Sequence, residues 1–319
     1  MGPRGQAPPL LNESLDKIGG GQNVFRAWFF QGMALGIGDD RWAAFDKTLQ
    51  VARDHGERVI ATLSNDLPEC DGSRKDKRYL QWYRSGYRTV VDPGMSSTYR
   101  TYVGQVVARY ASDPTILAWQ MINEANPRSL SAPYCLEDAA AEALRAFADD
   151  VGGLIKALDH NHLVSMGNTT SCGLGPAGPA ARAAGATSNY QYVHRSEYVD
   201  LCEIHDYGFS TTALIDPDKA HISECRDIGK PTFMGEVGIS QEEATKAVGG
   251  SCSSALACRA QLFDRKLKAS FDNSPPVVGW LAWAWCLPAD KCKSPAAQDY
   301  AIKPGDPTLE VLARYAESP

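Results

Sequence analysis

Short apolar runs alternate with amphipathic patterns along most of the chain. The runs are rich in β-branched and aromatic residues and begin near residues 23, 58, 116, 163, 199, 231 and 277. Between them, apolar residues recur every three or four positions, which is the spacing of one face of a helix. Strand–helix alternation with roughly 30 to 60 residues per unit predicts a parallel sheet whose strands are joined by helices.

The helical patterns are clearest in three places. Apolar stripes predict helices over about residues 42–52, 99–110 and 144–158. Near the C-terminus, Asp306 and Pro307 have the residue types of an N-cap and a first helical position, so another helix should start there.

Seven strands with this spacing favour a (β/α)8 TIM barrel, which needs about 250 residues, over an open doubly wound sheet. An eighth strand should precede residue 23. However, residues 1–11 are rich in Pro and Gly, and Pro8-Pro9 is unfavourable in a central strand. We therefore expect one barrel domain over residues 1–319, with its first strand degenerate or missing at the N-terminus.

Composition and charge argue against nucleic acid and membrane as partners of this protein. The chain has 319 residues, 44% of them hydrophobic and 22% charged, with a net charge of -6. This acidic balance disfavours a nucleic-acid surface, and the absence of a run of about 18 apolar residues argues against a membrane span. The start of the chain lacks the long apolar core of a signal peptide, so an exported form would take its signal from upstream.

Nine cysteines suggest an oxidising compartment. Cys252 with Cys258 and Cys286 with Cys292 are close in sequence, but neither pair has the spacing of a zinc or thioredoxin site. We expect two short disulfide loops there. Cys202 with Cys225 could form another disulfide, as could two of the remaining three cysteines, Cys70, Cys135 and Cys172. One cysteine would remain unpaired, and secretion is the expected localisation.

Polar and aromatic side chains gather at the C-terminal ends of the predicted strands, which meet at the mouth of a parallel barrel. They are Arg26, Trp28, Asn65, Asn123, Glu124, Asn168, His205, Tyr207, Glu236, Trp283 and Trp285. This set contains no Ser-His-Asp candidate and no histidine cluster with metal spacing, so we expect neither a metal nor another cofactor.

Glu124 and Glu236 are the most informative members of this set. Each follows a buried apolar run, where a lone ionised carboxylate would be costly. Either could be a salt-bridged strand end, but two at one mouth, beside indole rings, fit glycoside hydrolysis better. That reaction needs an acid/base and a nucleophile, with carboxyl groups about 5–5.5 Å apart for retention.

The ordered motifs resemble glycoside hydrolase family five, of clan A, in its mannanase-like and related β-glycosidase branches. "AWQMINEAN" resembles the Asn-Glu motif of strand four, "IHDYG" the His-x-Tyr of strand six, and "FMGEVG" the nucleophile segment of strand seven. "GWLAWAW" is similar to the strand-eight Trp segment and "NVFRAWFF" to the strand-two Arg segment. The resemblance spans most of residues 20–315, in family order.

The resemblance implies a role for each matching side chain. Glu124 would be the general acid/base and Glu236 the nucleophile, while Trp283 would stack under the sugar. The other implied contacts are Asn123 to the 2-hydroxyl, Tyr207 and Arg26 to Glu236, and His205 to the acid/base or the substrate. Independently of the family, an anionic nucleophile needs donors such as Arg26 and Tyr207, whereas an acid keeps its proton better in a less cationic, more apolar setting.

The remaining aromatic residues and two short motifs also need an interpretation. The insertion "YLQWYRSGYR" is expected to bring Trp82, Tyr83 and Tyr87 towards the mouth, whereas Trp42 and Trp119 are expected in the core. "GLGPAG" at 173–178 matches the GxGxxG pattern of a dinucleotide site, but prolines interrupt it, so a Gly/Pro-rich loop is the better interpretation. "HNH" at 160–162 fits a capped turn better than a nuclease motif.

The favoured hypothesis is a secreted retaining glycoside hydrolase, most consistent with an endo-β-1,4-mannanase or β-glucanase-like enzyme acting on oligo- or polysaccharide. An exo-acting β-mannosidase or β-glucosidase on short glycosides is the alternative. A catalytically silent carbohydrate-binding barrel and a nucleotide-dependent enzyme are the rivals from other classes. The sequence does not distinguish mannose from glucose or endo from exo action.

Overall fold

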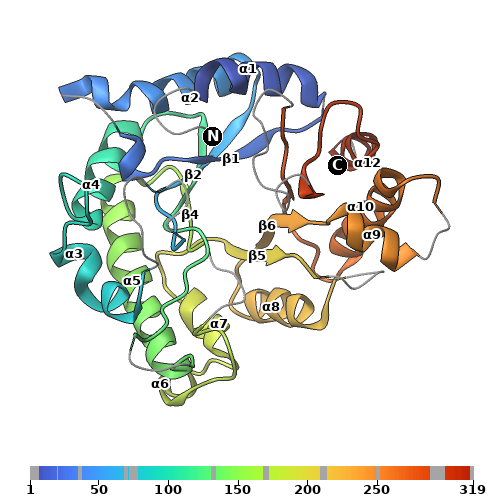
Figure 1. Ribbon diagram of the computed structural model, residues 1–319. Coiled ribbons are helices and arrows are strands. Elements are labelled where there is room, and N and C mark those ends of the chain that lie inside the picture. The colour runs from blue at the N-terminus through green and yellow to red at the C-terminus, as the bar shows by residue number, and fades with distance from the viewer. Residues whose placement is uncertain are drawn as a thin grey trace.

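The strands lie side by side in the middle of the fold, in chain order (Figure 1). The computed structural model describes residues 7–19, 21–34, 38–67, 71, 78–130, 134–167, 172–208, 214–248, 252–287 and 299–316. The strands are β1 Val24–Trp28, β2 Arg58–Thr62, β3 Ile116–Gln120, β4 Leu163–Ser165, β5 Cys202–Asp206, β6 Thr232–Gly238 and β7 Trp280–Trp283.

All neighbouring strands are parallel. The ladders run β1-β2-β3-β4 and β5-β6-β7, and a parallel bridge from Ser165 to Leu201 joins the two groups. Consequently the C-terminal ends of all seven strands lie on one side, as the sequence pattern predicts. The fold is the (β/α)8 barrel, with seven strands among the described residues.

Helices connect the strands and surround them on the outside (Figure 1). They are α1 Ala7–Ile18, α2 Ala43–Asp54, α3 Tyr87–Thr89, α4 Tyr99–Tyr110, α5 Glu137–Leu158, α6 Pro179–Ala183, α7 Asn189–His194, α8 Asp216–Asp227, α9 Gln241–Val248, α10 Ala255–Asp272 and α12 Thr308–Ala316. Shorter helical turns are η1 Gln31–Met33, η2 Gly38–Trp42 and η3 Trp82–Gly86. In the part of the chain that the structure describes, no helix has the length and apolar character needed to cross a bilayer.

The predicted helices are confirmed as α2, α4, α5 and α12. Their ends follow local chemistry: the Thr98 side chain accepts a hydrogen bond from the backbone N–H of Thr101 at the start of α4. Asp306 accepts from the N–H of Thr308 at 2.9 Å, as expected for the cap of α12. Asp159 accepts from the N–H groups of Asn161 and His162, so "HNH" is a capped turn.

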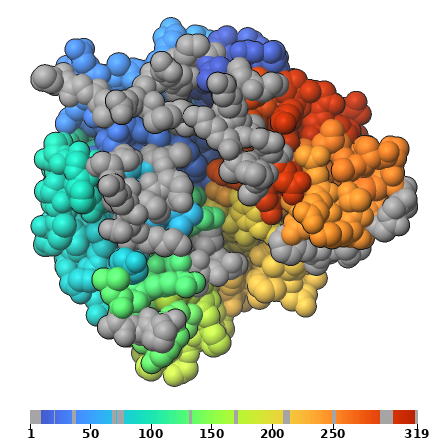
Figure 2. Space-filling model, viewed as in Figure 1, coloured from blue at the N-terminus to red at the C-terminus, as the bar shows by residue number. Residues whose placement is uncertain are grey.

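The N-terminal segment differs from the other barrel units. Among the described residues before Val24, no strand is present, and Ala7–Ile18 forms the helix α1, which packs against α2. Pro8 and Pro9 fall in its first turn, where a missing N–H loses no helical hydrogen bond. The segment after α1 meets α12, with Gly21 beside Ala316, so the blue and red ends lie together (Figure 1 and Figure 2).

Two hydrophobic clusters fill the space between strands and helices. The larger lies under α2, α4 and α5 and contains Trp42 and Trp119, both buried as predicted. The second lies between β5–β7 and the helices α8, α9, α10 and α12.

The prediction that Trp82, Tyr83 and Tyr87 approach the mouth is wrong. Tyr83 and Tyr87 are buried in the larger cluster, and Trp82 packs against it. All three rings contact Phe147 of α5, with centroid distances between 4.9 and 5.8 Å. The short helix η3 and the start of α3 carry these rings onto the apolar face of α5, where burial stabilises them more than exposure at the mouth would.

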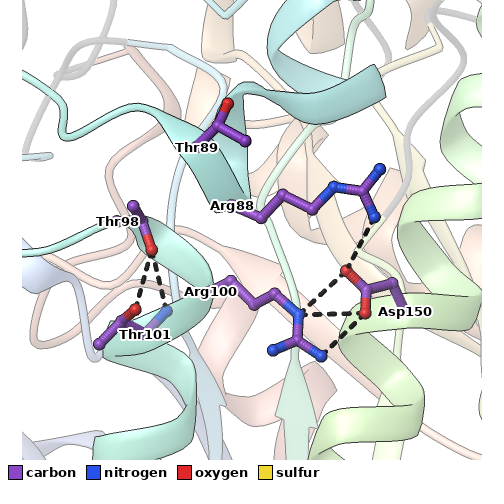
Figure 3. Close-up of a pocket in the computed structure, with 6 residues that line it drawn as sticks. All are labelled: Arg88, Thr89, Thr98, Arg100, Thr101 and Asp150. Carbon is purple, nitrogen blue, oxygen red and sulfur yellow. Dashed lines mark hydrogen bonds and ion pairs between the residues drawn. The ribbon is translucent and has the colours of Figure 1, made fainter.

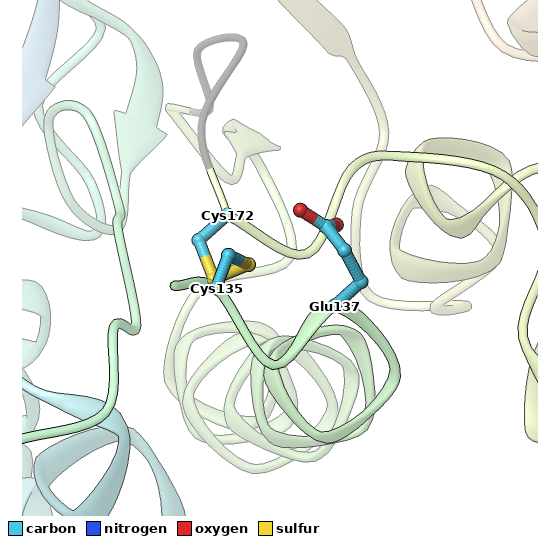
Figure 4. A group of neighbouring side chains, drawn as sticks. All are labelled: Cys135, Glu137 and Cys172. Atoms are coloured by element: carbon cyan, nitrogen blue, oxygen red, sulfur yellow. A yellow bond between two sulfur atoms is a disulfide. The ribbon is translucent and has the colours of Figure 1, made fainter. Parts of the chain in front are cut away.

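Disulfides are present at several predicted places. Cys202 bonds to Cys225, and Cys252 bonds to Cys258. Cys135 bonds to Cys172 and ties the start of α5 to the segment after β4 (Figure 4). Cys286 is also disulfide-bonded, whereas its predicted partner Cys292 and the remaining Cys70 lie outside the described residues.

Candidate active site

Glu124 lies four residues beyond the end of β3 in a strained backbone conformation. Its φ of 52° is the only positive value found at a non-glycine residue among the described residues. The N–H of Glu124 donates to the carbonyl of Gly167, just beyond β4, at 2.9 Å. Left-handed backbone at a non-glycine residue persists where its surroundings hold it, and it is concentrated at functional sites. Two strand ends therefore fix the position of this carboxylate.

Glu236 lies within β6 and is buried, and two donors hold its carboxylate. The guanidinium of Arg26 donates to Oε1, and the phenol of Tyr207 donates to Oε2. Burial raises the pKa of Tyr207, so its hydroxyl stays protonated and remains a donor. A carboxylate that accepts from a cation and a phenol is stabilised in its anionic form.

His205 stands between the two carboxylates. Its Nδ1 is 3.2 Å from Glu124 Oε1 and 3.6 Å from Glu236 Oε2. One polar atom of each of these three side chains lies within 4.8 Å of the others. This close approach of the carboxylates is compatible with the ~5–5.5 Å carboxyl separation of retaining glycosidases and shorter than the ~6.5–9.5 Å of inverting ones.

The setting of Glu124 is more cationic than sequence reasoning expects. Burial acts to raise the pKa of Glu124, but the hydrogen bond and charge of His205, with the charge of Arg26, lower it overall. The expectation of a less cationic, more apolar setting for the acid therefore does not hold. The reason is that His205 approaches Glu124 directly.

The amides form a chain beside the carboxylates. Asn123 Nδ2 donates to Asn65 Oδ1 at 3.1 Å, and Arg26 donates to Asn123 Oδ1 at 2.8 Å. A parallel bridge between Asn65 and Asn123 aligns their backbones. All three predicted residues are therefore brought together at adjacent strand ends.

The predicted indoles divide into two groups. Trp28 and Trp283 approach each other with ring centroids 6.3 Å apart, and the Arg26 guanidinium lies 4.7 Å from the Trp28 ring centre. Trp285 instead packs against the second hydrophobic cluster and forms a bridge with Ile302. Asn168 lies outside the described residues.

A third carboxylate, Glu203, lies beneath the site and was missed by sequence reasoning. It is fully buried on β5, two residues before His205, and accepts hydrogen bonds from three side chains. The signal was present in "CEIHDYG", because Glu203, His205 and Tyr207 alternate and so share one face of the strand.

The dinucleotide alternative has no support in the structure. The N–H groups of Gly173 and Gly175 in "GLGPAG" donate to Glu137 Oε2, at 2.9 and 3.3 Å. A carboxylate of the chain itself thus takes the hydrogen bonds that a phosphate would need. Glu137 also approaches Cys135 and Cys172, but those two sulfurs form a disulfide and are not thiolate metal ligands (Figure 4).

A metal ion at Glu124 and Glu236 would compete with an ion pair that the site already contains. Glu124, His205 and Glu236 are suitable donor types, but the guanidinium of Arg26 already pairs with Glu236. The positive charge next to the Glu236 carboxylate therefore comes from Arg26.

A hollow lies on the outside of the barrel, between α3, α4 and α5 (Figure 3). Its charged groups are paired with each other: Arg100 is 2.9 Å and Arg88 3.8 Å from oxygens of Asp150. The hollow lies among helices rather than at the strand ends, and we assign no catalytic or binding role to it.

The chain is similar to several known proteins. The sequence profile described as "GH family 5 beta-mannosidase-like" matches residues 74–311. Mannan endo-1,4-beta-mannosidase 8 of Oryza sativa subsp. japonica is 27% identical over 262 residues, which cover 70% of this chain and 68% of the relative. Mannan endo-1,4-beta-mannosidase A of Hypocrea jecorina is 26% identical over 281 residues, covering 82% of this chain and 59% of the relative.

The fold has close counterparts among solved structures. The hyperthermostable endo-1,4-beta-D-mannanase from Thermotoga petrophila RKU-1 superposes with a TM-score of 0.68 at 18% identity, over 99% of both chains. The profile match covers well over half of the sequence, from before β3 to α12, and so includes both strand-end carboxylates. On this evidence the chain belongs to glycoside hydrolase family 5, in its beta-mannosidase-like group.

Proposed function

We propose that this glycoside hydrolase cleaves β-1,4-linked mannan within the polysaccharide chain and retains the anomeric configuration. The observation that carries the proposal is the close approach of Glu124 and Glu236, with Arg26 and Tyr207 both donating to Glu236. This arrangement suits a nucleophile that is anionic and an acid/base placed beside it.

In the proposed first step, a Glu236 oxygen attacks the anomeric carbon while Glu124 protonates the departing glycosidic oxygen. The product is a glycosyl ester on Glu236. In the second step, Glu124 as carboxylate removes a proton from water, and that water releases the sugar from Glu236. Glu124 is thereby returned to its protonated form.

Neighbouring side chains would bind the sugar. Asn123 accepts from the same guanidinium that pairs with Glu236 and would bond the 2-hydroxyl, where interactions strengthen in the transition state. Trp283 would stack on the sugar with Trp28 beside it, while Asn65 holds the amide of Asn123.

The substrate is proposed from the relatives. The curated relatives above are named as endo-acting mannan hydrolases, and the matched region covers only 59–68% of their lengths. The description of the matching family group, "beta-mannosidase-like", favours exo action on short glycosides as the second candidate. Digestion of linear β-1,4-mannan distinguishes them, because endo action releases mixed oligosaccharides early, whereas exo action releases mannose from the start.

The protein is proposed to act outside the cell. Its disulfides would form and persist in an oxidising compartment such as the extracellular space.

The test of mechanism replaces each carboxylate separately. Glu236→Ala and Glu124→Ala should each lower kcat/KM on mannan by roughly 10³-fold or more. With an aryl glycoside that has a good leaving group, azide should restore turnover of Glu124→Ala and yield the β-glycosyl azide. Glu142→Ala, on the exposed side of α5, is the control and should match the wild type. Near wild-type hydrolysis by either site variant would contradict the assignment.

A further inference from the structure

Beneath the paired carboxylates lies a closed polar network centred on Glu203. Gln120 Nε2 lies 2.6 and 2.7 Å from the two oxygens of Glu203, and Ser165 donates to Oε2 at 2.6 Å. Thr62 in turn donates to Gln120 Oε1 at 2.6 Å. The network therefore links β2, β3, β4 and β5 inside the barrel, around one carboxylate with no exposed surface.

The network connects directly to the reacting groups. His205 Nε2 lies 2.9 Å from Glu203 Oε1, and Arg26 Nη1 lies 3.8 Å from the same oxygen. On its other side, the His205 ring presents Nδ1 to Glu124. One imidazole thus lies between a buried carboxylate and the proposed acid/base, as in other sites where a carboxylate orients a histidine.

The position of Glu203 depends on its neighbour in β6. A Cβ added to Gly235 would collide with Glu203 Oε1 and with the rest of its carboxyl group. Glycine directly before Glu236 therefore leaves the space that the buried carboxylate occupies. The fold accommodates Glu203 even though burying an ionised group is costly unless the group is paired.

We propose that Glu203 is a positioning residue that holds the Nε2–H of His205 and compensates Arg26, so that Nδ1 of His205 shares a single proton with Glu124. The inference rests on the proposed function and extends it. In the resting enzyme the acid's proton belongs to the Glu124–His205 pair. During cleavage of the glycosidic bond, Glu124 transfers this proton to the departing glycosidic oxygen.

The sign of the effect follows from charge alone. A negative charge near a proton-binding pair raises the affinity of that pair for the proton, whichever atom carries it. Burial acts to raise the pKa of Glu203, but the hydrogen bond and charge of His205, with the charge of Arg26 and the hydrogen bond from Ser165, lower it overall, so Glu203 stays ionised. Besides Glu203 on its own strand, the charged groups that face His205 are Arg26 of β1, Glu124 beyond β3 and Glu236 of β6. Tyr207 donates to Glu236.

The first experiment measures the pH dependence of kcat/KM. Glu203→Gln keeps the shape of the side chain and removes its charge. Both limbs of the profile should move to lower pH, by about one unit or more, since the cluster loses a negative charge next to both carboxylates. Unshifted limbs in a folded Glu203→Gln enzyme would overturn the inference.

Two further variants separate charge from packing. Ser165→Ala removes one hydrogen bond to Glu203 but no charge, so both limbs should stay in place whatever happens to kcat. The double variant Gln120→Glu/Glu203→Gln exchanges the two side chains, so a carboxylate stays in the network but no longer lies at the position that contacts His205. It should return the limbs towards the wild-type positions while leaving kcat low, because Nε2 has lost its anionic acceptor. Equal shifts in Ser165→Ala and Glu203→Gln would show packing rather than charge and overturn the inference.

A second measurement needs neither activity nor the variant at Glu203. The chain has six histidines, so its imidazoles can be labelled with ¹⁵N and His205 identified by the signals lost in His205→Gln. In the wild type, Nε2 should stay protonated across the working pH range and only Nδ1 should titrate. A neutral ring protonated on Nδ1 would overturn the inference even if mannan hydrolysis is normal. Conversely, an enzyme without glycosidase activity would end the proposed function, and the ring nitrogens would still decide the role of Glu203.

Discussion

Glu124 and Glu236 are the same residue type, but their partners differ. Glu236 accepts hydrogen bonds from Arg26 and Tyr207, whereas Glu124 faces His205 and is partly exposed. A cation and a phenol favour permanent ionisation, while a titratable imidazole allows a proton to be exchanged. The proposed roles of nucleophile for Glu236 and acid/base for Glu124 thus follow from the neighbours of the two carboxylates rather than from the residue type.

Tyr207→Phe tests the phenol at the nucleophile. The change removes one charge-assisted hydrogen bond to Glu236 and leaves the ring, so kcat/KM should fall about 10- to 100-fold. Thermal unfolding should change little. Tyr300→Phe is the matched control, since its ring packs edge-on against Tyr207 at 5.7 Å. A loss at Tyr300 equal to that at Tyr207 would contradict the assigned hydrogen bond.

At this scale the sequence predicts the strand-end residues but not what lies below them. Glu124, Glu236 and His205 each end or follow an apolar run, and the resulting break in hydrophobicity is visible in one dimension. Glu203 is inside such a run. Its importance depends on Gln120 and Ser165, which are 83 and 38 residues away, and no local pattern reveals those partners.

At the scale of elements, the ends of β3 and β4 act together to place the acid/base. Gly167 has a φ of 80°, and its carbonyl accepts from the N–H of Glu124. A Cβ at Gly167 would collide with the backbone carbonyl of Ile122, which cannot rotate away. The strained backbone at Glu124 therefore depends on a glycine in the next strand unit.

Gly167→Ala should displace Glu124 and lower kcat by about 100-fold, in keeping with the effect of a misplaced catalytic group. Gly185→Ala is a matched control, because Gly185 also has a positive φ, of 70°, yet a Cβ there meets nothing within 4 Å. The control should lose about 1 kcal/mol of unfolding free energy, the cost of left-handed backbone, and keep its activity. Denaturant unfolding and kcat measured on both variants check this, and an active Gly167→Ala would contradict it.

Elements with a strong apolar stripe were predictable, and α1 was not. The stripes of α2, α4 and α5 face a buried cluster, so burial and helical period agree. In α1 the two prolines argue only against a strand, and they sit in the one turn of a helix that tolerates them, so no pattern predicted the helix itself. Trp82, Tyr83 and Tyr87 show the same limit, because aromatic residues suit a sugar-binding surface and a core equally well.

For the molecule as a whole, a buried acid between β5, α8 and α10 makes stability depend on pH. Asp218 of α8 is fully buried, and neither carboxylate oxygen has a hydrogen-bond partner among the described residues. Burial, and then the charge of Asp206, raise the pKa of Asp218 to about 7, despite Lys266 nearby. The folded state therefore binds a proton that the unfolded state releases near its ordinary value of 3.8.

Because the folded pKa is the higher one, deprotonation opposes folding. The penalty is absent below about pH 4, grows as the pH rises towards 7, and is complete above it. Asp218→Asn should raise the unfolding free energy at pH 8 by on the order of 3 kcal/mol and change it little near pH 4. Urea unfolding at both pH values measures this. Asp216→Asn, exposed on the same helix, should leave the difference unchanged.

The fold as a whole was predictable because it repeats. Seven strand–helix units, with polar residues near the C-terminal ends of several strands, are recognisable even when single elements are not. The N-terminal segment does not follow this repeat. The expectation of a degenerate or missing first strand agrees with the described residues, in which the helix α1 precedes β1.

The arrangement of β1 and β7 has a consequence for how the enzyme can change over evolution. Among the described residues, no backbone ladder joins β1 to β7, and the two sides of this gap meet through Arg26 with Glu236 and through Trp28 with Trp283. The first of these contacts also holds the proposed nucleophile, while Gly21 meets Ala316 of α12 on the same side of the barrel. Elsewhere a barrel can trade robustness against turnover by separate substitutions. At Arg26 and Glu236, by contrast, one substitution is expected to change both properties.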